Sequence, residues 1–170
     1  MGSKIVVAKA KLTSNEKEAA NRAEVTALLI RVGFRVYRPE ADCYGEDLIV
    51  RTPDADLRAV QLKATPDVNW KKYGGKSLWM LFPDPKSAGP RKWFLVPHDK
   101  LYKWAESEHG QAPKWKKAWH WPYIPWKLGK FLNPFEIKGS RRPGALRGKL
   151  RVGSKFFEPL PPKELSAWGR

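Results

Sequence analysis

The sequence predicts an α+β fold in which helices flank a central mixed sheet of about five strands. Three observations predict this class. An amphipathic helix with a capping signal lies near the N-terminus, three strand-like segments follow it as a meander from Phe34, and two further apolar segments precede a second amphipathic helix. The order helix, strands, helix indicates a sheet with helical cover.

The first helix is expected to run from about Asn15 to Val32. Thr13 with Glu16 three residues later is typical of a capping box, and Gly33 follows the last periodic residue. Apolar residues recur at three- and four-residue spacing, which indicates one buried face. These residues are Val25, Leu28, Leu29 and Val32.

The expected strands cover residues 34–38, 48–50, 57–62, 78–82 and 93–96. The second and third flank a cluster of turn formers at residues 52–56, which predicts an antiparallel hairpin centred near Asp54 and Ala55. Pro97 opens the second helix, which is expected to end at about Glu108.

Composition divides the chain into four parts. Residues 1–12 are an N-terminal arm, 13–110 the core domain, 111–138 a basic aromatic segment, and 139–170 a basic tail rich in Gly and Pro. The tail is expected to be mobile or to order on nucleic acid, and the alternative is a solvated tail with no specific contact.

The chain carries 33 Lys and Arg against 17 Asp and Glu, a net charge of +16. This excess favours a polyanionic partner, nucleic acid ahead of an anionic membrane. Eight of the nine tryptophans fall between Trp70 and Trp126, interleaved with lysines. Lysine neutralises phosphate and indole stacks on bases, so this composition also favours nucleic acid.

The single cysteine, Cys43, excludes an internal disulfide and fits a reducing compartment. No run approaches the roughly 18 apolar residues that a membrane span needs, and no signal peptide opens the chain. These features predict a cytoplasmic protein. With one cysteine, His98, His109 and His120 offer no zinc-ligand spacing.

The hairpin carries the residues with the clearest chemical pattern. Asp47 is expected to lie roughly opposite Leu62, between Gln61 and Lys63. Because side chains alternate along a strand, Gln61 and Lys63 point the same way while Val60 and Leu62 point into the core. The pattern predicts that a carboxylate, an amide and an ammonium group converge.

These groups suit metal-assisted phosphodiester hydrolysis. Asp47 would anchor Mg²⁺ or Mn²⁺, with the Gln61 amide oxygen and the Leu62 carbonyl as further ligands. Lys63 would orient the attacking water or stabilise the pentavalent phosphorus. Glu24, beside the buried stripe of the first helix, is expected near Asp47; the alternative is an ordinary exposed glutamate.

At these residues the sequence resembles the PD-(D/E)XK nuclease superfamily. The core of that family is a helix and a meander whose second strand carries Asp and whose third carries Glu or Gln, any residue, then Lys. The matches are Glu24, Asp47, Gln61 and Lys63. Tyr44-Gly45-Glu46 stands where the motif has Pro, and Gln61 replaces the usual acid, which removes a negative charge from the metal site. In having Gln at this position, the sequence is similar to the branch of the family that contains some intron-encoded homing endonucleases and certain restriction-type enzymes.

The resemblance implies a restriction-endonuclease-like fold and a metal-dependent DNA endonuclease that acts on double-stranded DNA as a homodimer or higher homo-oligomer. Expected nucleic-acid-binding residues are Lys114, Lys116, Lys117, Lys127, Lys130, Arg141 and Arg142. Two alternatives stay open: a non-catalytic nucleic-acid-binding protein on a degenerate nuclease fold, and a basic RNA-binding structural protein.

Overall fold

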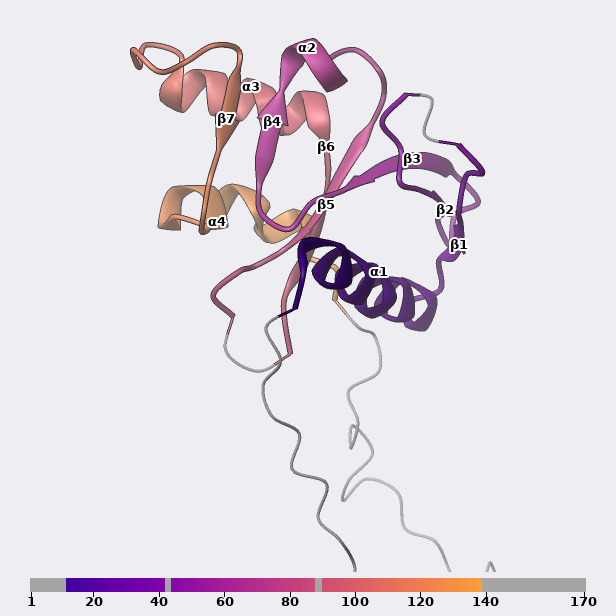
Figure 1. Ribbon diagram of the computed structural model, residues 1–170. Coiled ribbons are helices and arrows are strands. Elements are labelled where there is room, and N and C mark those ends of the chain that lie inside the picture. Colours follow the sequence, from indigo (N-terminus) through magenta and orange to yellow (C-terminus); the bar gives the residue numbers. More distant parts are fainter. Residues whose placement is uncertain (1–11, 42–43, 88–89, 139–170) are drawn as a thin grey trace, which may run out of the picture. The chain divides into compact units, whose positions relative to one another are not determined.

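A five-stranded sheet forms the centre of this computed structural model, which describes residues 12–41, 44–87 and 90–138 (Figure 1). Its strands, in spatial order, are β1 (Arg35–Tyr37), β2 (Leu48–Arg51), β3 (Leu57–Leu62), β5 (Trp79–Pro83) and β6 (Trp93–Pro97). β1, β2 and β3 form the antiparallel meander, β5 runs parallel to β3, and β6 runs antiparallel to β5. The predicted α+β class with a mixed sheet is therefore confirmed.

Helix α1 (Ser14–Arg31) covers one face of this sheet. The Thr13 side chain accepts from the Glu16 N–H and the Glu16 carboxylate accepts from the Thr13 N–H, so the predicted capping box is present. Gly33 follows with φ +94°, a conformation that suits glycine after a helix end. The helix buries Val25 and Leu29 in a cluster with the sheet. The other buried members of this first cluster are Leu48, Val50, Val60, Leu62, Leu81, Trp93 and Leu95.

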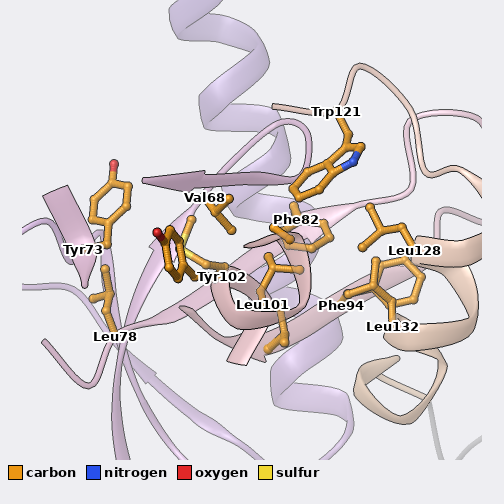
Figure 2. Close-up of a cluster of buried hydrophobic side chains, with 13 residues drawn as sticks. Val68, Tyr73, Leu78, Phe82, Phe94, Leu101, Tyr102, Trp121, Leu128 and Leu132 are labelled. Atoms are coloured by element: carbon orange, nitrogen blue, oxygen red, sulfur yellow. The ribbon is translucent and has the colours of Figure 1, made fainter. Parts of the chain in front are cut away.

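A second hydrophobic cluster lies on the opposite face, and Figure 2 draws its buried side chains, among them Val68, Phe82, Leu101, Trp121 and Leu128. Helices α3 (His98–His109) and α4 (Trp126–Leu132) pack there with the short helix η1 (Asn133–Phe135). So do α2 (Trp70–Tyr73) and a two-stranded sheet of β4 (Asp67–Asn69) and β7 (Ala118–His120). The central sheet is thus covered on both faces, which explains why β5 and β6 are continuously apolar in sequence.

The β2–β3 hairpin has a register one residue different from the prediction. Leu48 pairs with Val60 and Arg51 pairs with Leu57, so the five-residue loop is centred on Asp54 and Asp47 lies beside Gln61 rather than opposite Leu62. The loop closes by a hydrogen bond from the Thr52 N–H to the Asp56 carbonyl at 2.8 Å, with Ala55 at φ +71°. An odd number of loop residues shifts the centre of the hairpin by half a residue.

Residues 111–138 fold onto the second cluster, although their sequence had predicted no definite structure. β7 pairs with β4, and Trp121, Leu128 and Leu132 are buried (Figure 2). The predicted arm, apart from Leu12, and the predicted tail lie outside the described residues, as does Cys43. In the part of the chain that the structure describes, no helix has the length and apolar character needed to cross a membrane.

Candidate functional site

Asp47 lies immediately before β2, with its carboxylate directed to the end of β3. Its backbone N–H donates to the Val60 carbonyl at 2.8 Å, which continues the hairpin ladder. Its Oδ2 accepts from the Leu62 N–H at 2.7 Å and from Nε2 of Gln61. The predicted proximity of Asp47 to both residues is therefore observed, despite the shifted register.

Gln61 is buried in the sheet, with 8% of its surface exposed. It pairs with Met80 of β5, so its side chain shares the face of the second cluster. Its Nε2 also lies 3.3 Å from the Leu62 carbonyl oxygen. The Asp47 carboxylate and the Leu62 carbonyl thus both face the Gln61 amide, whose orientation follows from the groups around it.

Lys63 follows β3 and is half-buried. Its N–H donates to the Leu81 carbonyl at 2.8 Å, which extends the parallel pairing with β5. Its Nζ lies 5.3 Å from the centre of the Tyr73 ring, an attractive cation–π geometry. Gly45 belongs to the same region, because a Cβ there would lie 3.2 Å from Tyr73 and 3.6 Å from Oε1 of Gln61.

Asp47 borders two surface pockets. One, of about 390 Å³, contains Asp47, Gln61, Leu62, Lys63 and Ala64 from the hairpin, and Ser14, Lys17, Glu18 and Asn21 from α1. The other, of about 430 Å³, is lined by Arg22, Arg38, Pro39, Glu40, Glu46 and Asp47. Asp47, Gln61 and Lys63 therefore open onto one hollow beside the first half of α1.

Sequence reasoning missed the contribution of the first half of α1. Glu18 lines the pocket that holds Asp47, and it also pairs with Arg22. Ser14, Lys17, Glu18 and Asn21 recur at three- and four-residue spacing, the signature of one helix face. The spacing was visible in the sequence. Because these residues are polar, however, it did not indicate which element their face of the helix would lie beside.

Glu24 was expected near Asp47, and the structure engages it elsewhere. Its carboxylate accepts from Nε of Arg91 at 3.1 and 3.2 Å, from Nη2 of Arg91, and from the Trp93 indole N–H at 2.9 Å. The Arg91 guanidinium holds the pKa of Glu24 below its ordinary value. Glu24 does not line either pocket that contains Asp47, and its contacts join α1 to β6.

The donor set fits one kind of metal site. Among the described residues, no three of His, Cys, Asp and Glu gather as a metal-binding group. The site offers the Asp47 carboxylate and the Leu62 backbone carbonyl as oxygen donors. Nε2 of Gln61 donates to both, so the Gln61 amide would add its oxygen as a third donor only with the amide turned over. Mg²⁺ keeps several waters and binds through one or two carboxylates, so this set suits a largely hydrated magnesium ion rather than a dedicated protein cage.

An aromatic layer lies behind Lys63. Tyr73 packs edge-on against His98, with ring centres 5.6 Å apart. His98 is fully buried, its Nε2 accepts from the Asn69 N–H at 3.3 Å, and its Nδ1 lies 3.0 Å from Asp99. Burial lowers the pKa of His98 despite the opposing Asp99. Because Nε2 accepts from the Asn69 N–H, the ring proton is assigned to Nδ1, which donates to Asp99. His98 thus supports Tyr73 by packing against its ring, and it is not directed at the pocket.

The predicted nucleic-acid-binding residues are in different settings. Lys114, Lys116 and Lys117 are exposed before β7. Lys127 donates to Glu108 at 2.8 Å, and Nζ of Lys130 lies 3.9 Å from the Trp126 ring centre. Arg141 and Arg142 lie outside the described residues. Three of the four tryptophans in this segment, Trp115, Trp119 and Trp121, pack on the second cluster.

Comparisons with known proteins found no matching family model, no matching curated protein and no matching solved structure.

Proposed function

We propose that this protein is a metal-dependent endonuclease that hydrolyses phosphodiester bonds in DNA, with Mg²⁺ or Mn²⁺ as the cofactor. The observation that carries the proposal is that Asp47, Gln61 and Lys63 line one pocket, with Asp47 hydrogen-bonded to the strand that carries the other two. The net charge of +16 suits a polyanionic substrate.

The roles follow from the chemistry of each group. Asp47, Gln61 and the Leu62 carbonyl would hold the ion, which supplies Lewis-acid polarisation of the phosphate and a more acidic water. Lys63, steadied by Tyr73, would balance the negative charge that develops on phosphorus. Glu18 takes the place proposed for Glu24, because it is the acid of α1 that lines this pocket.

The proposed fold assignment is restriction-endonuclease-like. Its support is the order of elements: a helix comes first, then a meander in which Asp47 precedes the second strand and Gln61 lies in the third. Cutting both strands of a duplex needs two such sites, so the proposal includes a homodimer or higher homo-oligomer.

Plasmid nicking in Mg²⁺ or Mn²⁺ tests the proposed activity. We expect Asp47→Asn and Lys63→Ala each to slow nicking about 10²-fold or more, the usual effect of removing a charge-stabilising group from a catalytic site. The matched control is Asp54→Asn, which removes an exposed carboxylate from the tip of the same hairpin. DNA binding should persist in all three variants. Nicking that neither Asp47→Asn nor Lys63→Ala diminishes would contradict the site.

The second candidate is a nucleic-acid-binding protein without hydrolytic activity. The observation that favours it is the amide at Gln61, which leaves the Asp47–Gln61 pair with one carboxylate where the resembled family has two. It predicts no nicking by the native protein with any divalent ion and unchanged DNA affinity on adding Mg²⁺. A basic RNA-binding structural protein predicts, in addition, tighter binding to structured RNA than to DNA at matched salt.

A further inference from the structure

Two aromatic side chains, one just before α4 and one at its first residue, stay exposed while their neighbours are buried. Tyr123 is 45% exposed and Trp126 is 72% exposed. Between and around them, Trp121 and Leu128 are buried and Ile124 packs on the second cluster. Figure 2 shows Trp121 and Leu128 directed into that cluster. The backbone that carries the two exposed rings is therefore anchored from both sides.

Each exposed ring has a lysine ammonium over it. Nζ of Lys86, from the β5–β6 loop, lies 4.2 Å from the Tyr123 ring centre, and Nζ of Lys130 lies 3.9 Å from that of Trp126. The nearby acid Glu108 is already paired with Lys127 at 2.8 Å. The surface formed by Lys86, Tyr123, Trp126 and Lys130, called the aromatic–lysine surface below, thus joins two exposed rings to two cations.

We infer that the aromatic–lysine surface binds unpaired nucleotides of a single-stranded polynucleotide. A base stacks on the ring face opposite the lysine, and the ammonium neutralises a phosphate of the same strand. In a duplex the base faces are already stacked on one another, so protruding rings of this kind have no face to meet. Anchoring by buried neighbours lowers the ordering cost of binding.

The burial of α4 argues against a lipid surface as the occupant. Leu128 and Leu132 are already buried in the second cluster, so α4 has no apolar face left to lie in a membrane interface. A nucleotide needs only a ring face and a cation for its phosphate. The inference relies on the nucleic-acid partner of the proposed function and not on its hydrolysis.

Fluorescence anisotropy in EDTA, which prevents metal-dependent cleavage, tests the inference on the full chain. The probes are labelled oligothymidylate and oligouridylate of about 12 nucleotides, within the usual site size, and a duplex of the same length. We expect Trp126→Leu and Tyr123→Leu each to weaken single-strand binding about 5- to 150-fold, the range for loss of one stacked base. Trp126→Phe, which keeps a ring, should retain most of the affinity, and duplex binding should change little.

Tyr37→Leu is the matched control, because Tyr37 is 46% exposed on β1 and has no part in the aromatic–lysine surface. Stacking releases no counterions, so the loss of single-strand affinity caused by Trp126→Leu should persist as salt rises. The loss of affinity caused by Lys130→Gln should become smaller, because it removes a phosphate contact. Similar losses for both oligonucleotides support the inference for single strands of either sugar; a loss on one alone assigns the surface to that polymer.

Three results would overturn the inference: unchanged single-strand affinity in both leucine variants, equal losses on duplex and single strand, or binding to phosphatidylserine vesicles that Trp126→Leu abolishes while oligonucleotide binding is intact. Because all these readouts exclude divalent ions, their failure is distinct from a failure to observe nicking.

Discussion

At the scale of single residues, Gly45 is a position in the candidate site where an added side chain would meet both backbone strain and a close neighbour. It has φ +95°, and a Cβ on it would lie 3.2 Å from the Tyr73 ring. Tyr73 in turn lies beneath Lys63, and Asp47 follows Gly45 by two residues. A side chain at Gly45 would therefore strain the backbone and press on the group that steadies Lys63.

We expect Gly45→Ala to lower the free energy of unfolding by about 1–2 kcal/mol, the cost of placing a Cβ at positive φ. It should also slow plasmid nicking. The matched control is Gly75→Ala, since Gly75 has φ +72° but nothing within 4 Å of its Cβ position. Urea unfolding of both variants measures the backbone strain that they share. Their nicking rates measure the additional effect of the contact with Tyr73, which only Gly45→Ala makes. Equal nicking by both would show that the contact with Tyr73 does not matter to the site.

At the scale of elements, Glu24 connects α1 to the strand that carries Trp93. Arg91 and the Trp93 indole both donate to its carboxylate, and Trp93 is 1% exposed in the first cluster. The ion pair with Arg91 is partly exposed to solvent, so it contributes little on its own. The larger contribution is the acceptor that Glu24 provides for a buried indole N–H.

We expect Glu24→Ala to destabilise the fold by about 1–3 kcal/mol, because it leaves the Trp93 N–H without this acceptor. Glu24→Gln keeps an acceptor oxygen and should cost about 1 kcal/mol or less. Thermal or urea unfolding of both variants at neutral pH measures the difference. Equal losses would mean that charge, and not the indole hydrogen bond, is what matters.

The Glu24 carboxylate also predicts a pH dependence. Its pKa in the folded protein is lowered, so the folded state binds the proton less tightly than the unfolded state does. Its stabilising effect is then complete above the ordinary carboxyl pKa of about 4.3 and is lost as pH falls through the folded value. The difference in free energy of unfolding between the native protein and Glu24→Gln should therefore become smaller as pH falls below the ordinary carboxyl pKa. A gap that stays constant down to pH ~2 would contradict a lowered pKa.

At the scale of the whole molecule, the net charge determines how strongly the affinity for a polyanionic partner depends on salt. The net charge of +16 is carried by a chain whose described lysines are mostly exposed. Binding to a polyanion releases counterions, so affinity should fall steeply with salt. The residues that contact phosphate set the slope of that dependence.

We expect the triple substitution of Lys114, Lys116 and Lys117 by Gln to reduce the slope of log K against log salt by up to about 2.7 on duplex DNA. The control replaces Arg31, Arg35 and Arg51, which are exposed on α1, β1 and β2, and removes the same charge. Binding isotherms at several salt concentrations give both slopes. Equal reductions would mean that net charge, and not the loop before β7, determines binding.

Much of the fold was predictable because its signals are local. The Thr13 capping box, the apolar spacing of α1 and the turn formers between β2 and β3 each act over a few residues. The one-residue shift of the hairpin register accompanies a positive φ at Ala55, a conformation that the residue type did not indicate. Glu24 was correctly placed at the edge of the buried stripe, but its partner, Arg91, lies far along the chain and gave no local sign.

By itself, the sequence determined the α+β class, the meander, and the approach of Asp47 to Gln61, since turn chemistry and the twofold alternation of strands act between near neighbours. Only the tertiary structure decided that β5 runs parallel to β3, that residues 111–138 cover the second face, and that Glu18 rather than Glu24 borders the pocket. Those features depend on pairings between distant segments, whose stabilisation comes from shared burial and leaves no periodic trace in either segment alone.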